Sequence, residues 1–154
     1  MPVAAHPGLY DPDQPEPVLN GSRCTACGRV YFPPVGIGCP DCGALADQLA
    51  PAELPAAGTL YSVATVHRHR GRDIEAPFAM GEIQLDAGPL IRCTMAVPEP
   101  ELHIGQQVVA RWVVQRTDDD GNDVIEPRFA PVDSAVGERE DAAVDRPVIE
   151  GRGR

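Results

Sequence analysis

The sequence predicts a mostly β protein with two modules, a small cysteine-rich metal-binding module followed by a barrel of short strands. Three observations predict this fold class. Two Cys-x-x-Cys pairs lie within residues 21–45. Five short segments rich in β-branched residues follow from Gly58 onward, and turn residues separate them. None of the intervening segments has the apolar periodicity of an amphipathic helix.

The chain divides into five consecutive parts by composition. Residues 1–20 contain five prolines and are expected to form an extended arm, because proline disfavours a helix. Residues 21–45 form the metal-binding module, and residues 46–57 are expected to be a linker. Residues 58–131 form the barrel. Residues 132–154 lose hydrophobic periodicity and gain acidic residues, which predicts a flexible tail.

The four paired cysteines, Cys24, Cys27, Cys39 and Cys42, predict a structural zinc site. A spacing of two residues lets both thiolates of a tight turn face one point, and only eleven residues separate the pairs. The pattern is typical of a rubredoxin-like zinc ribbon. Four thiolates leave no open position for water, so the zinc is expected to be structural. The aromatic residues within 30–34 are expected to shield the sulfurs.

Disulfides, thiol redox catalysis and an iron site are the alternatives for these cysteines. The N-terminus lacks the basic and apolar lead of a signal peptide, so we expect a cytoplasmic protein with reduced thiols. Thioredoxin-type catalysis needs a Cys-x-x-Cys at a helix start in a βαβ unit, which is not evident here. A rubredoxin-like iron site uses the same ligands and stays open. No apolar run approaches the roughly 18 residues of a membrane span.

Composition excludes two classes of chemistry. The formal net charge is −10, and all 13 basic residues are arginines. Without lysine the chain has no Schiff-base or lysine general-base chemistry. The acidic balance argues against broad electrostatic binding to nucleic acid. No histidine, carboxylate and nucleophile set is evident, and Glu82 and Glu126 are expected to be surface carboxylates, so we expect no catalytic residues.

The barrel is expected to consist of five strands joined by short turns. The expected strands are residues 59–67, 78–85, 90–97, 107–117 and 124–130. Tight turns at residues 86–89 and 118–122 predict hairpins, because both are rich in aspartate and glycine. Five strands at this size, one of them interrupted by a glycine, favour the OB-fold among small barrels.

Individual residues of the barrel have expected roles as well. Gly81 lies inside the second strand and predicts a bulge or bend there. Cys93 alternates with apolar residues and predicts a buried apolar thiol rather than a nucleophile. Phe78, Met80 and Trp112 are expected in the core, although aromatic side chains facing the groove of an OB-fold also stack on an adenine ring.

A basic cluster follows the first expected strand. His67, Arg68, His69, Arg70 and Arg72 lie within six residues of an otherwise acidic chain. One interpretation is a solvated cationic loop. The other is anion recognition, because arginine binds phosphate oxygens in a bidentate manner.

Several motifs together resemble one protein family. They lie in residues 21–34, 39–43, 58–62, 77–81 and 102–108, and the first two contain Cys24-x-x-Cys27-Gly28 and Cys39-Pro40-x-Cys42-Gly43. The chain resembles the zinc-ribbon/OB-fold acyl-CoA-associated proteins, a former domain of unknown function, over residues 20–131. Members often have a helical segment before the ribbon, whereas this chain has a proline-rich arm.

The resemblance implies a small non-catalytic subunit that partners a thiolase-superfamily enzyme. The partner is expected to be a thiolase or a retro-aldolase that acts on acyl-CoA, including those that shorten steroid side chains, in a heterotetramer. The OB-fold is expected to help bind coenzyme A, with Arg68, Arg70 and Arg72 at its phosphates and Phe78 as an aromatic contact. The alternatives are a single-stranded nucleic-acid-binding module and a rubredoxin-like electron carrier.

Overall fold

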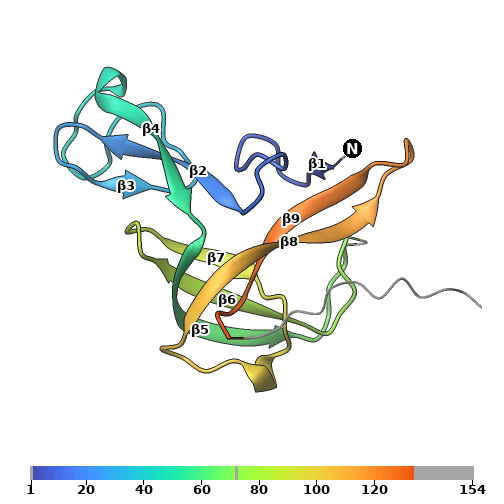
Figure 1. The fold of residues 1–154 in the computed structure, drawn as a ribbon. Helices are drawn as coiled ribbons and strands as arrows, with labels where there is room; N and C mark the ends of the chain where they lie inside the picture. The colour runs from blue at the N-terminus through green and yellow to red at the C-terminus, as the bar shows by residue number, and fades with distance from the viewer. Residues whose placement is uncertain (1, 72, 134–154) are drawn as a thin grey trace, which may run out of the picture.

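A computed structural model describes residues 2–71 and 73–133 and confirms a mostly β protein. Its elements form two separate sheets, one in the ribbon and one curled into the barrel (Figure 1). The strands are β1 (Val3–Ala4), β2 (Val18–Cys24), β3 (Val30–Tyr31), β4 (Leu49–Pro55), β5 (Ala57–Val66), β6 (Phe78–Leu85), β7 (Leu90–Thr94), β8 (Gln107–Thr117) and β9 (Asp123–Pro131). Two short 3-10 helices, η1 (Ala46–Gln48) and η2 (Glu99–Glu101), complete the described elements.

The ribbon sheet has the strand order β3-β2-β4. Strand β4 pairs antiparallel with the whole of β2, from Val18↔Pro55 to Cys24↔Leu49. This pairing corrects the expected linker at residues 46–57, most of which belongs to the ribbon. The strand contains Pro51 and Pro55, but β4 is an edge strand, and a proline without an N–H group is tolerated there.

Strands β5 to β9 form the barrel, in the order β9-β8-β5-β6-β7, and coincide closely with the five expected strands. The barrel closes where Met95 and Phe129 form a parallel bridge, next to the hydrogen bond from Ala96 N–H to the Phe129 carbonyl (2.7 Å). Four strands joined by antiparallel pairings on one side of β9, and a parallel bridge that closes the sheet on the other, are the OB-type arrangement. The predicted OB-fold is confirmed.

The N-terminal arm is attached to both modules rather than free. Strand β1 pairs in parallel with β9, through Val3↔Val124 and Ala4↔Ile125. Tyr10 is buried in the main core and packs at 5.6 Å against the ring of Trp112. In Figure 1 the arm lies between the ribbon and β9. The arm ends earlier than expected, because β2 already begins at Val18.

The bend that the sequence placed at Gly81 lies elsewhere. The register of β5 and β6 shifts between Leu60 and Ser62, so β5 carries the bulge. Gly81 is explained by packing instead. A Cβ atom there would lie 2.7 Å from Met95 Sδ and 2.9 Å from Leu60 Cδ1. A larger residue at position 81 would therefore force the Met95 and Leu60 side chains to move.

The largest fully buried side chains lie mainly in the barrel, and its inward-facing residues alternate along β6. They include Phe129, Leu60, Ile83, Leu85 and Val108, with Leu54 from the ribbon. Arg72 and residues 134–154, which include nearly all of the expected acidic tail, lie outside the described residues. Within the described residues, no helix has the length and apolar character to cross a membrane.

Replacing Gly81 with alanine is expected to destabilise the barrel by about 1–3 kcal/mol, the usual cost of overpacking a core. The new methyl group would push against Met95 and Leu60. Urea unfolding followed by the fluorescence of Trp112 measures the change.

Gly36→Ala is the matched control, because no heavy atom lies within 4 Å of a Cβ built at Gly36. Its free energy of unfolding is expected to stay within about 0.5 kcal/mol of the parent. Equal urea midpoints for Gly81→Ala and Gly36→Ala would contradict the packing explanation.

Candidate metal centre

The four paired cysteines converge at one end of the ribbon. Their sulfur atoms all lie within 4.8 Å of one another. The Sγ atoms of Cys24 and Cys42 are 3.7 Å apart, and those of Cys27 and Cys39 are 3.6 Å apart. The structure therefore brings together all four residues that the sequence predicts as metal ligands.

The two knuckles that carry these cysteines have the same local geometry. Gly28 N–H donates to the Cys24 carbonyl at 2.8 Å, and Gly43 N–H donates to the Cys39 carbonyl at 2.9 Å. Both glycines adopt the left-handed conformation, with φ of 79° and 75°. Glycine reaches this region without steric cost, which explains why each Cys-x-x-Cys pair is followed by one.

Backbone N–H groups contact the sulfurs from within the knuckles. Arg29 supplies a backbone hydrogen bond to Cys27, and Ala44 supplies one to Cys42. Cys39 receives two, from Asp41 and Cys42. Such donors stabilise the thiolate form that a metal binds.

A tyrosine hydroxyl also lies at the site. Tyr31 Oη is 3.0 Å from Cys39 Sγ and donates a 2.7 Å hydrogen bond to Asp41 Oδ2. The Tyr31 contact is the main cause that lowers the pKa of the Cys39 thiol to about 6, against the opposing effect of desolvation. Phe32 departs from the expected shielding role, since it packs against the barrel core instead.

The chemistry of the donor set fits a closed tetrahedral zinc site. Cys24 and Cys39 are buried, whereas Cys27 and Cys42 are exposed, so the site lies at the surface with half of its ligands covered. Four sulfur ligands fill the tetrahedron and leave no position for a water or substrate. The arrangement suits a structural role.

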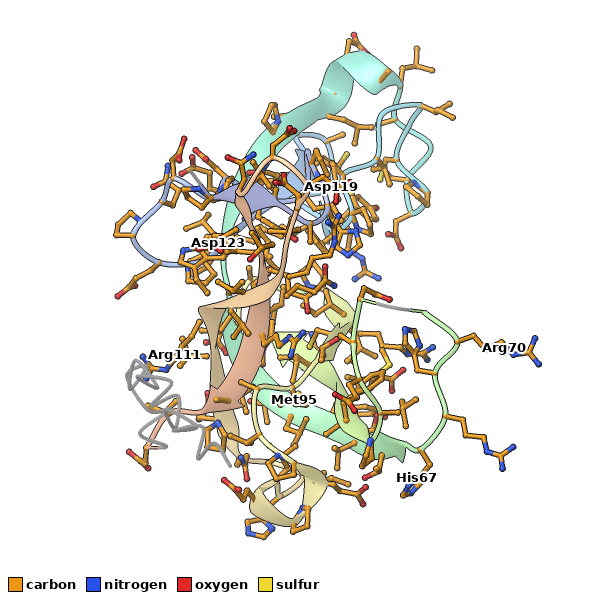
Figure 2. The ribbon with its side chains drawn as sticks, turned by 90° about the vertical axis from the view of Figure 1, so that its right-hand side faces the viewer. His67, Arg70, Met95, Arg111, Asp119 and Asp123 are labelled. Carbon is orange, nitrogen blue, oxygen red and sulfur yellow. The ribbon has the colours of Figure 1, made fainter. Side chains whose placement is uncertain are left out.

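The basic cluster lies in the connection between β5 and β6. Arg68 and Arg70 are exposed, and Figure 2 shows the Arg70 side chain pointing away from the barrel strands. His69 is held in place by Asp73 (Nε2 to Oδ1, 3.1 Å) and by edge-on contact with the Phe78 ring, at 5.5 Å between centroids. Arg72 lies outside the described residues.

A cleft of about 390 Å³ opens beside this loop, between the start of β6 and the ends of β8 and β9. Phe78 and Met95 contribute apolar wall, and Arg128 and Gln115 contribute polar groups. Arg68 and Arg70 do not line the cleft. The structure thus brings Phe78 to a cleft but does not bring the two described arginines into it.

The buried carboxylate that binds Arg128 and Gln115 of this cleft was missed from the sequence. Glu126 was expected at the surface, but it is buried and accepts a 2.7 Å hydrogen bond from Arg128 Nε. Gln115 Nε2 donates to the other carboxylate oxygen of Glu126 at 3.3 Å. The spacing of Glu126 and Arg128 on a strand places both side chains on one face, and this was the available signal.

Cys93 behaves as the alternation predicted. Its side chain is half-buried in β7, and burial raises the pKa of the thiol to about 12. Its Sγ lies 3.8 Å from the Gly81 carbonyl. A thiol with so high a pKa is a poor nucleophile at neutral pH.

Comparison with known proteins identifies both modules. Residues 15–47 match the rubredoxin-like zinc ribbon domain of ChsH2, and residues 52–113 match its C-terminal OB-fold domain. A DUF35 domain-containing scaffold protein of Methanocaldococcus jannaschii is 32% identical over 121 residues, which is 75% of this chain and 83% of the relative. The chain belongs to the ChsH2/DUF35 family.

A solved structure supports the same assignment for the ChsH2/DUF35 fold. The chain is similar to a chain of the Ltp2-ChsH2(DUF35) aldolase, with a TM-score of 0.58 and 25% sequence identity. The match covers 73% of this chain and 84% of the other. The family resemblance drawn from the motifs is therefore confirmed.

Removing the metal is expected to change which thiols react with a thiol reagent. With zinc bound, all four ligand cysteines are expected to be protected, although two of them are exposed to solvent. A chelator should make four thiols reactive. Cys93 should react only after denaturation, since it is half-buried with a raised pKa.

The reaction of the thiols is followed with a reagent that releases a coloured thiolate, by measuring its absorbance before and after the chelator is added. Cys93→Ser is the control, and it should lose only the thiol that appears on denaturation. Rapid reaction of Cys27 and Cys42 in zinc-loaded protein would contradict the four-sulfur site.

Proposed function

We propose that this chain is a non-catalytic, zinc-binding subunit that assembles in the cytoplasm with a thiolase-superfamily enzyme acting on acyl-CoA. The observation that carries the proposal is the extent of the match with the Ltp2-ChsH2(DUF35) aldolase, which spans both the ribbon and the barrel. The name of the Methanocaldococcus jannaschii relative, a scaffold protein, points the same way. Between the two reactions we favour retro-aldol cleavage over thiolysis, with steroid side chains as one class of substrate.

The proposed role of zinc, held by Cys24, Cys27, Cys39 and Cys42, is to fold the ribbon. Most of the fully buried apolar side chains belong to the barrel, so the ribbon has little core of its own. Zinc ligation contributes about 10–16 kcal/mol in small zinc-finger peptides, which is enough to fold such a module. The ribbon is then rigid enough to serve as a docking surface for the enzyme.

The proposed role of the barrel is to bind part of the coenzyme A moiety. Arg68 and Arg70 are exposed and form no ion pair within the described residues, so both guanidinium groups are available for phosphate oxygens. Arg72 extends the same run in the sequence. Phe78 lines the adjacent cleft of about 390 Å³, which is a suitable size for a fragment such as the adenine ring.

Co-expression tests the assembly directly. The chain, without a tag, is expected to co-purify with a tagged thiolase-superfamily protein from the same organism, as a stoichiometric heterotetramer that contains zinc. Native mass spectrometry and metal analysis measure the composition, and acyl-CoA cleavage is assayed on the complex. A zinc-bound chain that never joins the enzyme would contradict the proposal.

The arginine loop is tested on the same complex. Arg68→Ala combined with Arg70→Ala is expected to weaken acyl-CoA binding at least about tenfold, because a charge-assisted hydrogen bond contributes roughly 1.5–3 kcal/mol. Isothermal titration measures the dissociation constant.

Arg111→Ala combined with Arg116→Ala is the matched control, because it removes two exposed arginines from β8 and therefore the same charge as the loop variant. Arg111 lies on the opposite side of the molecule from Arg70 in Figure 2. The dissociation constant of this control should equal that of the parent complex. Equal effects of the loop variant and the control would assign the change to net charge rather than to phosphate contact.

A further inference from the structure

A hydrogen-bond network of three side chains connects the two knuckles of the metal centre. Arg29 Nε donates to Asp41 Oδ2 at 3.0 Å, and Tyr31 Oη donates to the same oxygen at 2.7 Å. The Tyr31 oxygen also lies 3.0 Å from Cys39 Sγ. Arg29 follows the first knuckle and Asp41 lies inside the second, so the hydrogen-bond network spans both halves of the site.

This contact makes Cys39 different from the other sulfur ligands. Among the described residues, Tyr31 is the only hydroxyl-bearing side chain in hydrogen-bond contact with a cysteine of the cluster. Cys39 is also one of the two buried ligands, with 4% of its surface exposed. A buried sulfur gains little from water, so a protein hydroxyl becomes its main polar neighbour outside the backbone.

The Tyr31 hydroxyl is held in place from two sides. The backbone of Tyr31 is paired with Ser22 in the β2–β3 ladder, which fixes the origin of the side chain. Asp41 fixes the other end of the side chain through the 2.7 Å bond, and Arg29 in turn orients Asp41. The hydroxyl cannot leave Cys39 without breaking its hydrogen bond to the carboxylate.

The ion pair between Arg29 and Asp41 is too exposed to be explained by its contribution to stability alone. The side chains of Arg29 and Asp41 are 64% and 44% exposed to solvent. Pairs this open to solvent contribute little to the free energy of folding. The pair is explained as a support for the Tyr31 hydroxyl, since Arg29 Nε and Tyr31 Oη both donate to Asp41 Oδ2.

We propose that Tyr31 is a positioning residue of the metal centre: its hydroxyl, held by Asp41, lies against Cys39 Sγ and fixes the direction in which that sulfur faces the metal. Asp41 and Arg29 act through Tyr31 by holding its hydroxyl. The inference rests on the zinc site proposed above. Partners of this kind around metal ligands tune affinity and electronic structure, and their loss lowers metal affinity about 10–100-fold.

Cobalt substitution of the full-length chain tests the role of Tyr31. Tyr31→Phe, which removes only the hydroxyl, is expected to shift the cobalt–thiolate charge-transfer absorption and to lower zinc affinity about tenfold in competition with a chromophoric chelator. Tyr61→Phe is the matched control, because Tyr61 is an exposed tyrosine on β5 of the barrel. It should leave both measurements unchanged. The fluorescence of Trp112 checks that the barrel stays folded.

Asp41→Ala separates positioning from a general loss of structure. It retains the tyrosine hydroxyl but removes its support, so it should shift the same absorption band in the same direction. The double variant Tyr31→Phe/Asp41→Ala should be no worse than Tyr31→Phe alone, because Asp41 acts through Tyr31. Additive losses of zinc affinity would overturn this order of action.

The outcomes distinguish this inference from the proposed zinc site. A parent protein that gives no tetrahedral cobalt–thiolate spectrum would overturn the metal assignment, and this inference with it. A parent that binds cobalt and zinc as expected, with Tyr31→Phe identical to Tyr61→Phe, would overturn only the role of Tyr31.

Discussion

The convergence of four cysteine sulfurs within 4.8 Å is the constraint on which the rest of the ribbon depends. It joins two knuckles that are separated along the chain. The constraint extends beyond the site, since β2 ends at Cys24 and its partner β4 begins at Leu49, directly opposite. The metal centre and the end of the ribbon sheet therefore lie next to each other.

The ribbon is coupled to the barrel by a short connection and by shared packing. Strand β4 ends at Pro55 and β5 begins at Ala57, so a single residue joins the two sheets. Leu19 and Leu54 from the ribbon belong to the same core cluster as the barrel residues, and Phe32 packs against that cluster. A partner that contacts both modules would therefore meet a surface whose two halves are tied together.

One contact of β9 closes the barrel, and a second covers part of the remaining edge of this strand. Strands β7 and β9 meet at the Met95–Phe129 bridge, and the remaining edge of β9 is paired with β1 near its start. The arm thus protects part of an edge that would otherwise present unpaired backbone groups. Tyr10 reinforces this by filling the core beneath the arm, and burial raises the pKa of its hydroxyl to about 12.

The sequence by itself determined which four cysteines converge, the five barrel strands and the family, because each of these depends on local spacing. Paired cysteines need only a tight turn, and alternation with period two identifies a strand wherever it pairs. The tertiary structure decided what depends on distant neighbours. Residues 46–57 were expected to be a linker, but most of them form β4 because β2 lies beside them, and the burial of Glu126 depends on contacts from another strand. The reason for Gly81 and the contact of Tyr31 with Cys39 are likewise long-range, since packing and hydrogen bonding across strands leave little trace in local sequence.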